Sequence, residues 1–127
     1  MAVEWASERA ERQLRESLPR RWEHTKGIAL RAGQLGPLAG DSAGVLQAAA
    51  YLHDIGYSPS LVRTEFHPLD GARYLRTLDV DDRVTRLVAN HSIALLEAEE
   101  RGLRAELASE FPLVEDPFLA TRWCSAT

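Results

Sequence analysis

Cysteine is almost absent from this sequence: Cys124 is the only one in 127 residues, so no internal disulfide can form. Small exported domains commonly depend on disulfides, and the lack of a pair favours a reducing, cytoplasmic location. No apolar run approaches the roughly 20 residues that a membrane-spanning helix needs, and the acidic N-terminal segment lacks the basic-then-apolar order of a signal peptide. We therefore expect a cytoplasmic protein that neither spans a membrane nor is exported by that route.

Lysine is also scarce, because Lys26 is the only lysine among the 15 basic residues and all the others are arginines. The net charge of −4 gives no overall basic surface of the kind that binds a nucleic-acid backbone. Arginine suits contacts to carboxylate and phosphate groups because its planar guanidinium offers two parallel N–H donors. The composition therefore gives no indication of a nucleic-acid partner, and no feature of the sequence indicates an oligomeric state.

Turn residues divide the chain into helical lengths, and no segment shows the alternation of a strand. The first four expected helices are one that ends before Pro19, one from about Arg20 to Gln34, one that Asp41 or Ser42 caps and that reaches His53, and one that His67 caps. The later ones are a helix capped by Asp79 or Asp81, a helix from Leu95 to Glu110 interrupted near Gly102, and a last helix opened by Pro117. This pattern predicts an all-α fold, a compact single-domain bundle of about six to seven helices over residues 1–127.

The four histidines of the chain fall where folding can bring them to one point. His53 ends an apolar helical stripe and is followed directly by Asp54, and such a polar pair is costly beside a core. His24 and His91 lie on or beside the apolar stripes of two other helices, and His67 begins a further one. A lone histidine is more often a core residue than a ligand. Four such positions with an adjacent carboxylate indicate instead a site for a borderline divalent metal such as Fe, Mn, Zn, Co or Ni.

These residues resemble the motifs of the HD-domain superfamily of metal-dependent phosphohydrolases. The match consists of His24, of His53 and Asp54 within L-H-D-I-G-Y, of His67 within F-H-P-L-D-G-A-R-Y-L, and of His91 within L-V-A-N-H-S, over about residues 21–91. The resemblance implies an all-helical domain with its core at about residues 20–94. It also implies that His24, His53 and Asp54 hold one metal ion and that His67 and His91 help hold a second. Asp54 would then bridge both ions and act as the catalytic residue.

The sequence departs from the family at its C-terminal end. Family members finish with a helix that carries a metal-binding Asp, whereas that position falls near Ala126 here and no acid follows Asp116. Three interpretations are open: the acid has been lost, the C-terminal helix is incomplete in this sequence, or Asp116 serves from another position. Asp116 directly precedes Pro117, and this favours a helix cap over a metal ligand.

A second departure concerns phosphate binding. Many family hydrolases carry a lysine near the position of Tyr57, whereas Lys26 lies one helix earlier and is expected to face solvent. Arg63, in the loop that follows Tyr57, is the candidate for substrate binding because a guanidinium binds two phosphate oxygens at once. A plain surface arginine is an equally good interpretation of Arg63.

Three functions are compatible with the predicted fold and metal site. The first is a metal-dependent phosphohydrolase that acts on a nucleotide or another small phosphorylated molecule through a mono- or dinuclear site, with Asp54 able to accept a proton. The second is a binding module that keeps the fold and a metal but lacks the terminal carboxylate and turnover. The third is a di-iron oxygenase with the same ligand count. Phosphoester turnover, metal binding without turnover, and oxygen uptake with Fe(II) distinguish the three.

Overall fold

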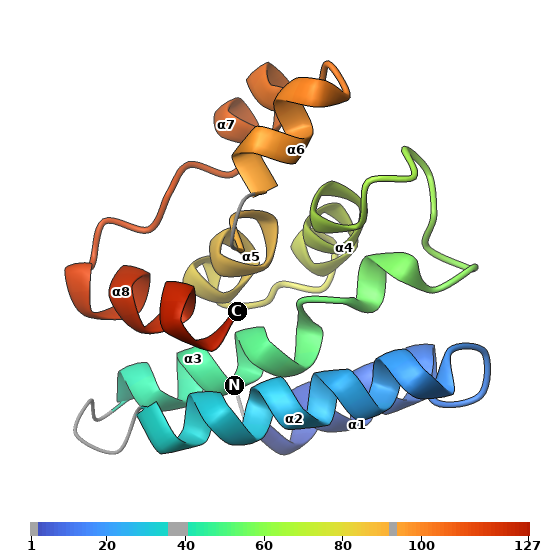
Figure 1. Ribbon diagram of the computed structural model, residues 1–127, viewed down its shortest axis with the longest axis vertical. Helices are drawn as coiled ribbons and strands as arrows, with labels where there is room; N and C mark the ends of the chain where they lie inside the picture. The colour runs from blue at the N-terminus through green and yellow to red at the C-terminus, as the bar shows by residue number, and fades with distance from the viewer. Residues whose placement is uncertain (1–2, 36–40, 92–93) are drawn as a thin grey trace.

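The computed structural model describes residues 3–35, 41–91 and 94–127 (Figure 1). These residues form helices and no strand, which confirms the expected all-α bundle. The helices are α1 (Val3–Leu14), α2 (Pro19–Leu35), α3 (Asp41–Leu52), the short 3₁₀ helix η1 (Ile55–Tyr57), α4 (His67–Arg76), α5 (Asp82–Ala89), α6 (Ala94–Glu100), α7 (Arg104–Glu110) and α8 (Pro117–Ala126). None of the described helices is long and apolar enough to cross a bilayer. The expected cap at Asp41 or Ser42 lies outside the side chains that the structure describes.

The first three helices pack against one another as a layer, drawn in blue to green in Figure 1. Alanines are buried in all three helices, and small side chains allow helix axes to approach closely. These alanines include Ala6, Ala10, Ala29, Ala32 and Ala49. The close packing holds the N-terminal half of α2, which carries His24, beside the C-terminal end of α3, which leads to His53.

The remaining helices cover one side of this layer and its end. Helices α4 and α5 pack on each other, α5 also contacts α3, and α4 contacts η1. Helices α6 and α7 pack together above them, and α8 returns to contact α2 and α3 (Figure 1). Because of this return, the C-terminal end of the chain lies at the place where α2, η1, α4 and α5 meet.

Two capping predictions have different outcomes. Asp81 accepts a hydrogen bond from the backbone N–H of Arg83 and so caps α5, as expected. The expectation that His67 caps α4 was wrong by one residue, because Phe66 is the N-cap and His67 is already helical. Pro68 fits the first turn, where its missing N–H is not needed. The imidazole of His67 is therefore not used as a cap.

The expected interruption near Gly102 divides the long sixth helix into α6 and α7. Gly102 has a φ of 71°, a left-handed conformation that glycine adopts without a Cβ clash. The backbone N–H of Leu103 donates to the carbonyl of Ala98 across this turn. The described residues therefore contain eight α-helices where the sequence predicted six to seven.

Helix η1 lies almost directly against α4. A Cβ placed on Gly56 would lie 2.1 Å from the carbonyl oxygen of His67 and 2.8 Å from the backbone nitrogen of Gly71. A Cβ on Gly71 would in turn lie 3.2 Å from the backbone nitrogen of Gly56. Glycine at both positions therefore fixes the short distance between the His53–Asp54 pair and the start of α4.

A buried carboxylate ties the preceding loop to α4. Asp70 is 3% exposed and accepts hydrogen bonds from the backbone N–H groups of Arg63 and Thr64, at 2.9 and 3.0 Å. The hydroxyl of Thr64 donates to the same carboxylate at 2.9 Å. These bonds satisfy Asp70 within the loop and helix, so it serves the framework around His67.

Candidate metal centre

Three side chains from two helices form a compact donor group. His24 lies on α2, His53 directly follows α3, and Asp54 is the next residue. One nitrogen or oxygen from each of the three lies within 4.8 Å of those of the other two. His53 and Asp54 are buried and His24 is exposed, so the group is open to solvent on the α2 side.

Asp54 connects this group to a second pair of histidines. Its Oδ1 lies 3.4 Å from Nε2 of His53 and 3.5 Å from Nε2 of His67. Nε2 of His67 lies 2.9 Å from Nε2 of His91, which follows α5. One carboxylate oxygen therefore lies between the two sets of imidazoles.

Two of the imidazoles have features that suit metal binding. Nδ1 of His53 lies 2.6 Å from the carbonyl oxygen of Ala50, which can only accept, so Nδ1 is the donor and Nε2 is the ring nitrogen beside Asp54. Burial, together with the nearby imidazole of His91, lowers the pKa of His67 to about 2. His67 is therefore neutral at ordinary pH, the form in which histidine coordinates a metal. Imidazoles with one carboxylate suit borderline divalent metals.

A stack of planar groups borders the centre. The ring of Tyr57 lies 4.0 Å from that of His67 at an interplanar angle of 19°. The guanidinium of Arg21 lies over the Tyr57 ring at 3.5 Å, and its Nη1 is 3.6 Å from Oδ2 of Asp54. Burial raises the pKa of Tyr57 despite the opposing effect of Arg21. Stacking on Tyr57 places the guanidinium of Arg21 at the edge of the group formed by His24, His53 and Asp54.

These residues surround an open pocket of about 320 Å³. Its lining includes Arg21, all four histidines, Asp54 and Tyr57, and also Ile28, Glu97 and Thr127. Glu97, on α6, is half-buried, and its carboxylate makes no hydrogen bond or ion pair with the residues that the structure describes. The pocket thus combines a metal-type donor set, one arginine and one unpaired carboxylate.

A family model for the HD domain matches residues 21–114. The chain belongs to the HD domain family. The search of curated proteins and the search of solved structures each found no match to this chain. HD domains generally bind divalent metal ions, and HD phosphohydrolases act on phosphorylated small molecules.

Within this HD domain, the five residues predicted as metal ligands all line the same pocket. Arg63, the predicted phosphate-binding residue, does not line it. The Arg63 side chain is exposed, and its guanidinium donates to the carbonyls of Ser60 and Val62. Arg63 is close to Asp54 and His67 in sequence, but its side chain lies on the outer surface of the loop.

The C-terminal helix places its residues differently from the sequence-based expectation. Ala126, the position assigned to the missing acid, is fully buried in the hydrophobic core. Thr127 lines the pocket instead. Asp116 precedes α8, its carbonyl accepts the N–H of Ala120, and it does not line the pocket. The residue at this end of the chain that faces the metal centre is therefore Thr127, one position after the expected Ala126.

Sequence reasoning missed Arg21, Tyr57 and Glu97 as lining residues. Arg21 precedes His24 by three positions and so shares its helical face, a signal that the i, i+3 rule could have found. Glu97 lies on α6, and no local pattern in the sequence gives the direction of that helix relative to the pocket.

Proposed function

We propose that this HD domain is a metal-dependent phosphohydrolase that acts on a nucleotide or another small phosphorylated molecule. The observation that carries the proposal is the position of Asp54. One of its carboxylate oxygens lies between His53 and His67, and the other faces Arg21. Histidines that can bind a metal ion therefore lie on one side of the Asp54 carboxylate, and an arginine that can bind a phosphate lies on the other.

The residues that would hold the metal fall into two sets. His24, His53 and Asp54 would hold one divalent transition metal, and Asp54, His67 and His91 would share a second. Such cations, when bound, lower the pKa of a water molecule and neutralise charge on phosphate oxygens. Fe, Mn, Zn, Co and Ni are all compatible with this donor chemistry.

The other lining residues have separate roles in the proposal. Arg21, held flat on Tyr57, presents N–H donors to the oxygens of the phosphate under attack. Asp54 and the half-buried Glu97 are the carboxylates of the pocket that can accept the proton released by water. Tyr57 and Ala50 keep His67 and His53 in orientation through stacking and through the Nδ1–H bond.

An activity assay with a defined metal tests the proposed function. We expect the protein loaded with Mn²⁺, Fe²⁺, Co²⁺, Ni²⁺ or Zn²⁺ to release phosphate from p-nitrophenyl phosphate or from a panel of nucleotides. Chelation should remove this activity, and readdition of the metal should restore it. Stoichiometric metal binding without turnover of any of these esters would favour the non-catalytic module instead, and oxygen uptake with Fe²⁺ would favour an oxygenase.

An acid introduced at the end of α8 should strengthen the site. We expect Thr127→Asp to raise metal affinity about tenfold, because Thr127 lines the pocket and a carboxylate adds an anionic ligand there. Ala126→Asp should instead lower the free energy of unfolding by about 3 kcal/mol, since it places a charge in the core. Metal titration calorimetry and urea unfolding measure the two effects. The reverse pattern would show that Ala126 faces the metal centre.

A further inference from the structure

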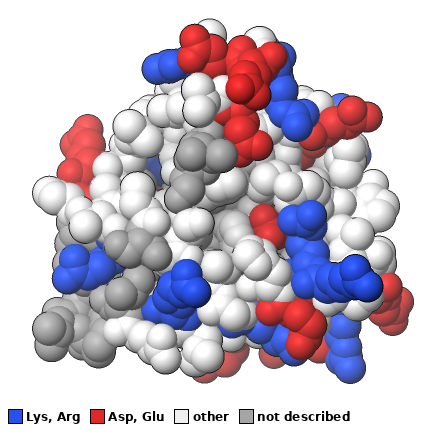
Figure 2. All heavy atoms as spheres, viewed as in Figure 1, with Lys and Arg blue, Asp and Glu red and all other residues white. Residues whose placement is uncertain are grey.

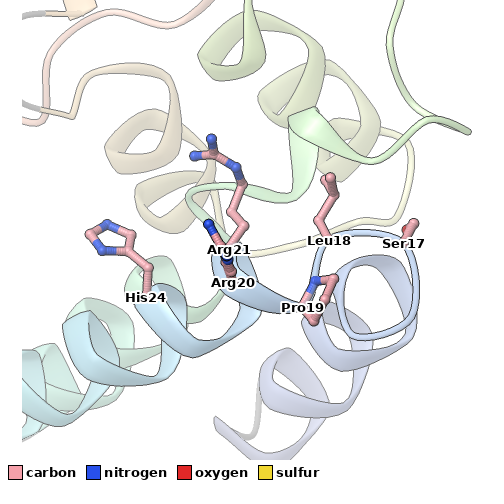
Figure 3. A pocket seen from close by; sticks show the side chains of 6 residues that line it. All are labelled: Ser17, Leu18, Pro19, Arg20, Arg21 and His24. Atoms are coloured by element: carbon pink, nitrogen blue, oxygen red, sulfur yellow. The ribbon is translucent and has the colours of Figure 1, made fainter.

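A second open pocket, of about 610 Å³, adjoins the metal centre. Its lining comes from the turn before α2 and from the first turns of α2, and consists of Ser17, Leu18, Pro19, Arg20, Arg21 and His24 (Figure 3). Arg21 and His24 also line the metal-centre pocket, so the two pockets share these side chains as a common wall. A molecule whose phosphate lies at the metal centre has this second pocket directly beside it.

The second pocket has a positive charge that its own lining does not neutralise. None of the residues that line it is acidic, although the chain as a whole has a net charge of −4. Arg20 is exposed, and its guanidinium makes no hydrogen bond or ion pair with the described residues. An uncompensated guanidinium on a concave wall raises the local concentration of anions. The pocket is therefore suited to an anionic group.

A neighbouring pocket on the other side of the same turn lacks this property. Its volume is about 550 Å³, and four of its lining residues are charged. Those charges pair with one another: Arg15 with Glu11 at 2.8 Å, and Lys26 with Glu23. In the view of Figure 2, basic side chains lie at the right centre of the molecule with acidic side chains next to some of them. The basic residues of the neighbouring pocket are thus paired with acidic ones, and Arg21 faces Asp54, whereas Arg20 has no acidic partner among the described residues.

We propose that the pocket at Arg20 binds the part of the substrate that lies beyond the reacting phosphate, and that this part carries an anionic group of its own. The proposal rests on the proposed function for the place of the reacting phosphate. The substrate class is then a small molecule with two anionic groups, one at Arg21 and the metal centre and one at Arg20. Leu18 and Pro19 line the same pocket and supply apolar contacts for the carbon skeleton.

Two nucleotides that differ by a single phosphate provide the test. Calorimetric titration of the Mn²⁺-loaded protein with adenosine 3′,5′-bisphosphate and with AMP measures the contribution of a second anionic group. We expect about five- to tenfold tighter binding of the bisphosphate, the effect of one charge-assisted contact at a partly exposed site. Arg20→Ala should remove this preference and leave the affinity for AMP unchanged. Arg20→Glu should bind the bisphosphate more weakly still.

Arg31→Ala is the matched control, because it removes an exposed arginine from the same helix outside both pockets. It should keep the wild-type preference, and circular dichroism should show unchanged helix content in all variants. Equal affinity of the wild type for the two nucleotides, or equal losses in Arg20→Ala and Arg31→Ala, overturns the proposal. An Arg20-dependent preference in a protein that hydrolyses no phosphoester supports this pocket and contradicts only the proposed function. Hydrolysis without the preference contradicts only this inference.

Discussion

Gly56→Ala is expected to lower the free energy of unfolding by about 3 kcal/mol, because the added methyl group has no space. Its Cβ would lie 2.1 Å from the carbonyl oxygen of His67 and 2.8 Å from the backbone nitrogen of Gly71. Both neighbours are backbone atoms, which cannot rotate away as the end of a side chain does. Helices η1 and α4 must therefore move apart, and urea unfolding should report the loss.

The same substitution should also damage the metal centre in any protein that still folds. The Cβ would push against His67 itself, whose Nε2 lies 3.5 Å from Oδ1 of Asp54. Separating η1 from α4 lengthens this distance, so Oδ1 of Asp54 would no longer lie near both His53 and His67. Calorimetric metal titration of the folded fraction should therefore show weaker binding as well as lower stability.

Gly27→Ala is the matched control for Gly56→Ala. Gly27 lies on the exposed side of α2, and a Cβ there would meet nothing within 4 Å. Alanine is the better helix former, so this variant should gain about 0.5–1 kcal/mol of stability. A Gly56→Ala protein as stable as the wild type would show that η1 and α4 are further apart than described.

Asp54→Asn should reduce both metal affinity and metal-dependent phosphatase activity by at least about 100-fold. The amide keeps the shape of the side chain but removes the negative charge that stands between His53 and His67. A helix-capping role does not account for Asp54, because its carboxylate makes no capping hydrogen bond to η1. The main contribution of the residue is therefore expected in the metal-loaded protein.

Thermal unfolding with and without Mn²⁺ separates this role from a structural one. A ligand that binds the native state raises the unfolding temperature, so the wild type should gain stability with added metal and Asp54→Asn should not. Asp82→Asn is the control, since Asp82 is exposed on α5 and pairs with Arg86 four residues away. Asp54→Asn protein that retains full metal content would falsify the ligand assignment.

The helices of this protein could be predicted from its sequence because their signals are local. Pro19, Pro117 and Gly102 mark helix boundaries through backbone geometry alone, and the structure places boundaries at all three. The one-residue error at His67 arose because several residues near a proline can begin a helix, and packing of the loop through Asp70 selects one. The number of helices differed because the interruption predicted near Gly102 divides the sixth helix into α6 and α7.

The candidate metal ligands could also be predicted from the sequence. His24, His53 and His91 lie on, beside or at the end of apolar helical stripes, His67 begins a helix, and Asp54 directly follows His53. The rest of the pocket depends on how distant segments pack. Arg63 lies four residues before His67 and Glu97 six residues after His91, yet of these two only Glu97 lines the pocket. The rotational orientation of α8 about its axis places Ala126 in the core and Thr127 at the pocket. Sequence alone thus determined the all-α fold, which depends on local periodicity, and it predicted the histidine and aspartate donor set. Only the tertiary structure decided which charged groups surround them, because long-range contacts set the direction of each helix.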